Sequence, residues 1–276
     1  MPGTNRCVAT AAAVLVLMGS WSGAFGATNK PSQAVLGLYG KVESFQWKEY
    51  DDNDHELLEE SGPIFGLGGF IDIPVERSVR AEGLAELFFG SVDYDGQTQE
   101  GVPTTTTTDY AGLMGEGRLY RSFPAGRDVT LTPFAGAGGR SWLRKINDGE
   151  HGVGKGYEEN WITLYALVGV SGQVKVAPKS ELFGRAALHL PVFNEVIIDW
   201  SSLGGPSDIT VNPGKEFGLD LEAGLRVESF MASVFYETLD FSKSDGEAAL
   251  IGSVPSTVWQ PKSEGRMIGL KAGLVF

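Results

Sequence analysis

The residues best suited to acid–base chemistry are the histidines and the carboxylates beside them. His55 follows Asp54 in an acidic stretch, residues 49–60, that also contains Asp51 and Asp52. His189 lies in an alternating segment, in the same row of side chains as Arg185. An imidazole held next to a carboxylate can act as a general base. For His189, however, the first hypothesis is a structural role as a hydrogen-bonded residue. For His55, the first hypothesis is that it belongs to a solvated acidic loop and has no catalytic role.

Two enzymatic alternatives start from these residues. In type, Asp51-Asp52 and Asp54-His55 resemble the Asp pair and the Asp-His pair of the omptin surface proteases, which are ten-stranded barrels. Omptin pairs face each other across the barrel, whereas these residues share one loop, and no further omptin motif is present. Barrel lipid-A deacylases use a Ser and a His on one strand. The position two residues after His189 holds Pro191, so the serine is missing there. A barrel hydrolase therefore remains an alternative hypothesis.

No motif for a cofactor or metal stands out. The sequence has no Walker loop, zinc motif or EF-hand. The glycine-rich run 135–139 is better explained by close strand packing. Acids in residues 49–60 have the oxygen chemistry for Ca²⁺ or Mg²⁺ but lack an ordered ligand spacing. We predict no cofactor, and at most loose cation bridging to lipopolysaccharide phosphates.

Charge and the N-terminal residues narrow the class of protein. The 276 residues include 22 basic and 35 acidic side chains, a net charge of −13, which disfavours binding to nucleic acid. Arg6 precedes an apolar run, residues 8–18, and small residues follow as far as Ala27, which predicts a signal peptide over residues 1–27. The single cysteine, Cys7, falls within it, so the predicted domain, residues 28–276, has no disulfide.

The last twelve residues alternate with a period of two. Their apolar row ends on the final residue of the chain, Phe276, and small residues with one charge, Lys271, lie between its members. The segment resembles the closing strand of Gram-negative outer-membrane β-barrels, in which a terminal Phe is read by the assembly machinery. That resemblance implies an assembly signal made of Leu270, Ala272, Leu274 and Phe276.

Similar alternation recurs along the chain, and no apolar run reaches the ~18 residues of a membrane-spanning helix. The predicted strands are residues 34–48, 65–73, 80–89, 113–120, 131–145, 161–176, 185–192, 217–226, 234–241 and 265–276. Long connections (49–60, 93–107, 147–160, 199–214 and 244–264) alternate with short turns. This order predicts an all-β fold: a single up-and-down antiparallel transmembrane β-barrel of about ten strands.

The charged rows indicate which side of each strand faces inward. They hold acids and bases in equal number, and a narrow lumen needs such balance because an unpaired buried charge is costly. The predicted lumen charge network comprises Lys41, Glu43, Asp72, Arg80, Glu82, Glu86, Glu116, Arg118, Arg140, Arg185, Asp220, Glu222, Arg226, Glu237 and Lys271, and Arg144 lies in the same rows. Aromatic residues share these rows, so we predict a plugged lumen. Lys271 is expected to pair with Glu43 or Glu237.

These inferences predict a monomeric protein of the Gram-negative outer membrane, exported through the periplasm. Its expected role is non-enzymatic: a surface protein with acidic extracellular loops and a charge-plugged lumen. The competing hypotheses are a narrow porin-like channel for small solutes and the barrel hydrolase described above. Its expected partners are outer-membrane lipid, lipopolysaccharide and the assembly machinery, together with an unidentified extracellular ligand.

Overall fold

The computed structural model describes residues 33–76, 78–98, 101–199, 201, 205, 208–251 and 254–276. The predicted signal peptide, residues 1–27, lies outside the described residues. Within the described part of the chain, no helix has both the length and the apolar character needed to cross a membrane.

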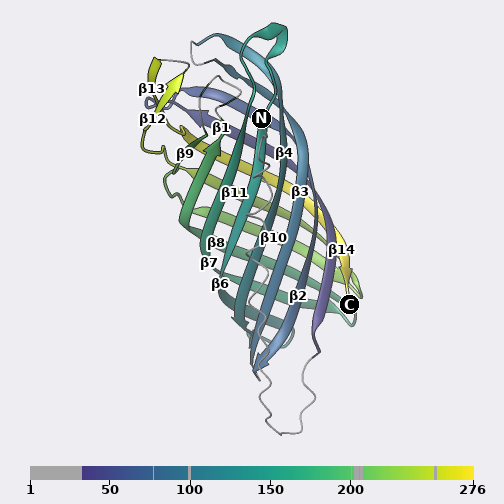
Figure 1. The fold of residues 1–276 in the computed structure, drawn as a ribbon. Helices are drawn as coiled ribbons and strands as arrows, with labels where there is room; N and C mark the ends of the chain where they lie inside the picture. The colour runs from purple at the N-terminus through teal and green to yellow at the C-terminus, as the bar shows by residue number, and fades with distance from the viewer. Residues whose placement is uncertain are drawn as a thin grey trace, which may run out of the picture. The chain divides into compact units, whose positions relative to one another are not determined.

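Ten long antiparallel strands form one closed barrel (Figure 1). They are β1 (Val35–Tyr50), β2 (Glu56–Glu76), β3 (Val79–Gln97), β4 (Pro103–Arg121), β6 (Val129–Ile146), β7 (Tyr157–Ala177), β8 (Ser180–Ile198), β10 (Gly218–Val227), β11 (Phe230–Phe241) and β14 (Lys262–Val275). Each of these strands pairs with the long strand that precedes it and the one that follows. The prediction of an up-and-down barrel of about ten strands is confirmed.

The C-terminal strand closes the barrel. β14 pairs with β1 from Gly37↔Val275 to Tyr50↔Lys262, and its other edge pairs with β11. At the end of the chain, the Phe276 amide donates to the Leu36 carbonyl at 2.8 Å, and the Leu36 amide donates to the Phe276 carbonyl at 3.2 Å. Closure leaves neither β1 nor β14 with an unpaired edge, which removes the usual liability of edge strands.

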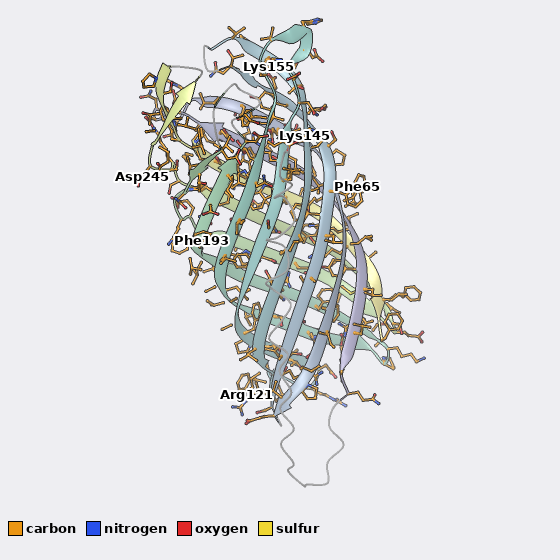
Figure 2. The ribbon with its side chains drawn as sticks, in the orientation of Figure 1. Phe65, Arg121, Lys145, Lys155, Phe193 and Asp245 are labelled. Atoms are coloured by element: carbon orange, nitrogen blue, oxygen red, sulfur yellow. The ribbon has the colours of Figure 1, made fainter. Side chains whose placement is uncertain are left out.

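Side chains alternate between the two faces of the barrel wall, as expected for strands. Leu67, Leu87 and Ile268 on the outer face are 64%, 61% and 61% exposed, whereas Tyr39 and Phe45 on the inner face are buried. Figure 2 shows Phe65 and Phe193 likewise pointing away from the barrel. An apolar band of this extent is stable when it contacts lipid instead of water.

The two ends of the barrel differ in their connections. At the short-turn end, the described residues add only the two-residue β5 (Phe123–Pro124). The long-loop end carries η1 (Glu150–Gly152), β9 (Ile209–Val211), and a hairpin of β12 (Glu247–Ile251) with β13 (Val254–Val258). The connection predicted over residues 244–264 therefore contains a strand pair of its own.

Strands continue past their predicted limits at the long-loop end. Most of the stretch 49–60 belongs to β1 and β2, and residues 51–55 alone connect them. The threonine run 104–108 belongs to β4 and pairs with β3, with Thr107 opposite Asp93. Polar composition suggested loops, but β-branched threonines favour strands and cross-strand charge pairs support them: Lys48 Nζ lies 3.0 Å from Glu59. Trp161, at the long-loop end of β7, points inward and is fully buried.

Candidate functional site

The inward charges of the barrel form a series of ion-pair groups, here called the lumen ladder. Lys41 lies between two carboxylates, with its Nζ 2.9 Å from Glu43 and 2.5 Å from Glu86. The Tyr39 hydroxyl donates to Glu86 at 2.9 Å. All four side chains are buried, so the two carboxylates share one ammonium, and Glu86 accepts a hydroxyl hydrogen bond as well.

A second group of the ladder contains His189. Arg118 pairs with Glu116 and with Glu82, the latter at 3.0 Å. Glu116 accepts a hydrogen bond from the Tyr165 hydroxyl at 2.8 Å, and His189 Nε2 lies 3.7 Å from the same carboxylate. The His189 ring stacks on Tyr165 with centroids 4.5 Å apart. His189 is therefore enclosed by an aromatic ring and a carboxylate that Arg118 already engages.

A third group joins β8, β10 and β14. Arg185 lies 2.9 Å from Asp220 and 3.1 Å from Glu222. Lys271 approaches Glu222 at 3.5 Å, not Glu43 or Glu237, which the sequence suggested as partners. The register explains this difference, because Lys271 lies directly opposite Lys41 on β1. Glu43 is already engaged by Lys41.

The remaining ladder residues form separate pairs. Arg140 lies 2.5 Å from Glu237, and Arg80 lies 2.9 Å from Asp72. Arg226 pairs at 2.9 Å with Glu181, a residue that sequence reasoning placed in a turn. Every residue of the predicted network thus points into the barrel beside an opposite charge.

A denser group, here called the rim cluster, lies near the long-loop end. Arg144 is only 1% exposed and contacts Glu49 at 2.9 Å, Glu60 at 2.7 Å and Glu159 at 2.9 Å. Neutral side chains also donate hydrogen bonds to these carboxylates. Trp47 and Gln260 donate to Glu49, Thr108 and Tyr110 donate to Glu60, and Trp161 donates to Glu159. Sequence reasoning missed the three carboxylates because it assigned residues 49–60 and 147–160 to loops.

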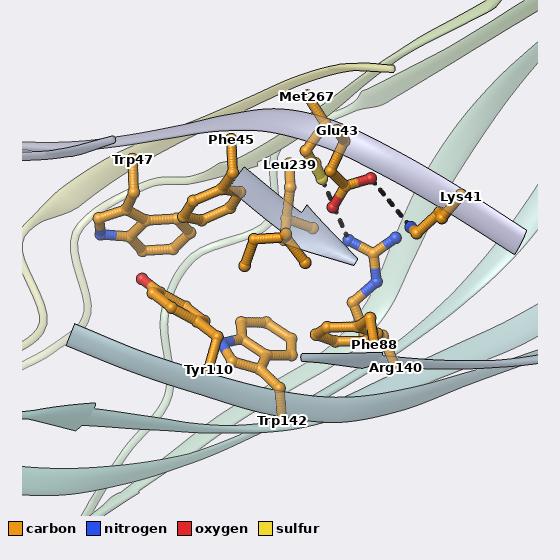
Figure 3. Close-up of a pocket in the computed structure, with 11 residues that line it drawn as sticks. Lys41, Glu43, Phe45, Trp47, Phe88, Tyr110, Arg140, Trp142, Leu239 and Met267 are labelled. Carbon is orange, nitrogen blue, oxygen red and sulfur yellow. Dashed lines mark hydrogen bonds and ion pairs between the residues drawn. The ribbon is translucent and has the colours of Figure 1, made fainter. Parts of the chain in front are cut away.

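Aromatic rings pack around the rim cluster. Trp161 stacks on Trp142 with ring centroids 5.1 Å apart, and Trp47 and Phe241 meet Trp161 at 5.3 and 5.0 Å. Figure 3 shows Trp47, Tyr110 and Trp142 turned toward one another, with Arg140 beyond them. Ala249 and Val258 of the β12–β13 hairpin pack against this layer. The layer is therefore covered by a loop as well as filled by rings.

Two cavities among the described inward side chains are small. The cavity lined by Phe45, Trp142 and Arg140 has a volume of about 20 Å³, and so does a second one beside His189. A volume of this size admits one water molecule. A third hollow, of about 910 Å³, lies among Glu59, Asp95 and the threonines of β4.

The candidate Asp-His site of the first loop is exposed. His55 Nδ1 lies 3.2 Å from Asp51 Oδ2. The main-chain amides of His55 and Asn53 donate hydrogen bonds to the Asp51 carboxylate. These bonds, that of His55 most of all, lower the pKa of the Asp51 carboxyl group. Lys243 and Lys262 pair with Asp52 and Asp54. The loop's carboxylates are therefore engaged locally by main-chain amides and lysines.

The predicted assembly-signal residues lie on the outer face of β14 and at its end. Leu270, Leu274 and Phe276 are all exposed, and Ala272 lies in the same row. No three His, Cys, Asp or Glu side chains among the described residues are grouped in a way that could hold a metal ion.

Comparison with known proteins finds similarity in fold. No protein-family model and no curated protein sequence matches the chain. Among solved structures, the outer membrane protease OmpT of Escherichia coli is 12% identical with a TM-score of 0.62, over 91% of this chain and 98% of that one. The AIDA-I transport unit of E. coli is 12% identical (TM-score 0.43; 90% and 92% covered). Ail of Yersinia pestis is 11% identical (TM-score 0.34; 89% and 100% covered).

At these identities the likeness concerns the fold, and OmpT alone of these three exceeds a TM-score of 0.5. Together with the ten-strand closure and the apolar outer face, the likeness to OmpT shows that the chain has the fold of an outer-membrane β-barrel.

Proposed function

We propose that this protein is a non-enzymatic surface protein of the Gram-negative outer membrane, with a closed lumen and a long-loop end that faces outward. The single observation that carries this proposal is the dense packing of charged and aromatic side chains inside the barrel. Ion pairs and aromatic rings pack the barrel, and two cavities between them each hold about 20 Å³. A scaffold of this kind presents its loops to external partners and passes no solute through its wall.

The sealed interior weighs against the porin-like alternative, because a conducting pore needs a continuous hydrated path. The loop geometry weighs against the hydrolase alternative. Asp51 and His55 are close together, but the neighbouring Asp52 and Asp54 are bound to Lys243 and Lys262. A catalytic carboxylate pair across the barrel from His55 is not formed by those residues.

Orientation can be tested by labelling single cysteines on intact cells. Lys155 lies at the tip of a long loop and Arg121 at the opposite, short-turn end (Figure 2). We expect the Lys155→Cys variant to react with a membrane-impermeant maleimide, and the Arg121→Cys variant to react after the outer membrane is permeabilised. The reverse pattern, or equal labelling of both variants in intact cells, would contradict the proposed placement.

The outer row of β14 supports a proposal about assembly. Phe276 ends the apolar row, and its main chain bonds to Leu36 across the closing seam. Deleting Phe276 removes both this closure and the predicted signal, so we expect a several-fold loss of heat-modifiable barrel in membranes. Lys155→Ala, in a loop, is the matched control and should assemble normally. Wild-type membrane levels of the truncated chain would exclude the assigned role of Phe276.

A further inference from the structure

The rim cluster buries more negative than positive charge. Glu49, Glu60 and Glu159 are each at most 5% exposed, and the guanidinium of Arg144 contacts all three. Among the described residues, Arg144 is the one cation within ion-pair distance of these carboxylates. If all three acids were ionised, one guanidinium would face three carboxylates and leave a buried negative excess, which is costly away from water.

The hydrogen bonds single out Glu60 as the carboxylate that the guanidinium holds most firmly. Nε and Nη2 of Arg144 both donate to it, Nη2 at 2.7 Å. Its oxygens also accept from hydroxyl groups, Oε1 from Thr108 at 2.8 Å and Oε2 from Tyr110. Donors on both oxygens favour the ionised form of a carboxyl group. Glu60 is therefore the acid best suited to balance Arg144.

Glu49 and Glu159 share the remaining nitrogen of the guanidinium. Nη1 of Arg144 lies 2.9 Å from Oε1 of Glu49 and 2.9 Å from Oε2 of Glu159. The same two oxygens accept from indole N–H groups, that of Trp47 at 3.0 Å and that of Trp161 at 2.8 Å. The other oxygen of each acid accepts no hydrogen bond from the described residues. Each side chain thus keeps one oxygen on which a proton can be carried.

The other titratable groups that face these acids are tyrosines. Tyr94 on β3, Tyr110 on β4 and Tyr157 on β7 all interact electrostatically with the carboxylates. Phenols have an ordinary pKa of about 10, so they stay neutral between about pH 5 and pH 8 and add no charge to the cluster. Among the described side chains, the acids themselves are therefore the groups that can reduce the negative excess, by binding a proton.

We propose that Glu49 and Glu159 form a binding site for one proton, which the folded barrel holds at neutral pH. Two carboxylates in one buried site resist ionising together, and the bound proton belongs to the pair and not to either residue. Trp47 and Trp161 donate to this pair and belong to the aromatic layer. Loss of the proton therefore places a second negative charge against the rings that pack the mouth of the barrel, which makes this end sensitive to alkali.

The bound proton implies a definite dependence of stability on pH. In the unfolded chain both acids are solvated and ionise near their ordinary pKa of about 4.3. Between about pH 5 and pH 8 the folded barrel then binds one more proton than the unfolded chain, so its stability falls as the pH rises. The limiting slope is a change of about tenfold in the unfolding equilibrium constant per pH unit.

Glu49→Gln and Glu159→Gln test this slope, because glutamine imitates a protonated acid and leaves the other acid to ionise beside Arg144. Urea unfolding in detergent is measured between about pH 5 and pH 8, where wild type should lose stability relative to either variant with the slope given above. Glu228→Gln, in the exposed Lys179–Glu228 pair, is the matched control and should keep the wild-type slope. Parallel pH dependences of wild type and both rim variants would overturn the proposal.

Infrared spectroscopy of the folded barrel tests the same proton without unfolding. In a detergent that has no carbonyl group, a protonated carboxyl group gives a C=O band that an ionised carboxylate lacks. At neutral pH we expect Glu49→Gln and Glu159→Gln each to lose the intensity of one carboxyl group relative to wild type, and Glu228→Gln to lose none. Equal bands in all four proteins would mean that both acids of the pair are ionised, against the proposal.

Discussion

The lumen ladder and the rim cluster both bury charge, but they stabilise it differently. In the ladder, acids and bases interleave: Lys41 is shared by two carboxylates, and Glu222 is shared by Arg185 and Lys271. In the rim cluster, Arg144 alone faces three carboxylates, and it is less exposed than any of the ladder cations. Neutral hydrogen-bond donors, among them two indole N–H groups, stabilise carboxylates whose charge Arg144 alone does not balance.

The lumen ladder and the rim cluster therefore have different roles in the barrel. The ladder neutralises the part of the interior that the apolar outer band surrounds, where balanced pairs are required. The rim cluster lies nearer the long-loop end, where the outward residues at the same level, such as Lys48 and Glu59, are polar. Trp47 and Trp161 both donate to its carboxylates and fill space, so hydrogen bonding and closure of the mouth depend on the same side chains.

Removing the single rim cation should have the largest effect. In Arg144→Met, three buried carboxylates lose their shared guanidinium, and we expect a loss of at least about 3–5 kcal/mol in the free energy of unfolding. Urea unfolding in detergent, followed by tryptophan fluorescence, measures it directly at the neighbouring rings. Wild-type stability of Arg144→Met would mean that the neutral donors alone sustain the cluster. It would contradict the proposed dependence of the rim cluster on one cation.

A smaller effect is expected in the ladder. Lys41→Met leaves Glu43 and Glu86 without their ammonium, but Glu86 keeps the Tyr39 hydroxyl, so we expect a loss of about 2–3 kcal/mol. The exposed pair Lys179–Glu228 provides the control, and Lys179→Met should change stability by less than about 1 kcal/mol. If Lys41→Met destabilised the barrel more than Arg144→Met, the ladder and not the rim cluster would be the region that depends more on a single cation.

The sequence was sufficient to predict the fold and most of the ladder because both follow from alternation. A period of two places Lys41 and Glu86 on the inner face whatever the loops do. The rim carboxylates obeyed the same rule and were still missed. Glu49 follows Trp47 by two residues, and Glu159 precedes Trp161 by two, so continuing the inward rows past the polar residues would have found them.

The ion-pair partners across the lumen could not be predicted from alternation. Lys271 meets Glu222 because the registers of β11 and β14 set its height, and no pattern within one strand contains that offset. The difference in length between β8 and β10 could not be predicted either. Residues 217–226 gave a regular strand pattern, but nothing in them indicated that β8 would continue well beyond their level.

Conductance in a planar lipid bilayer tests most directly whether the lumen is closed to ions. We expect no stable conductance steps from the purified wild-type protein. We expect steps from a variant in which Trp47, Trp161 and Phe241 are all replaced by alanine, provided that this variant folds. A general porin reconstituted in the same bilayer is the positive control. Steady wild-type conductance comparable with that of the porin would contradict the account.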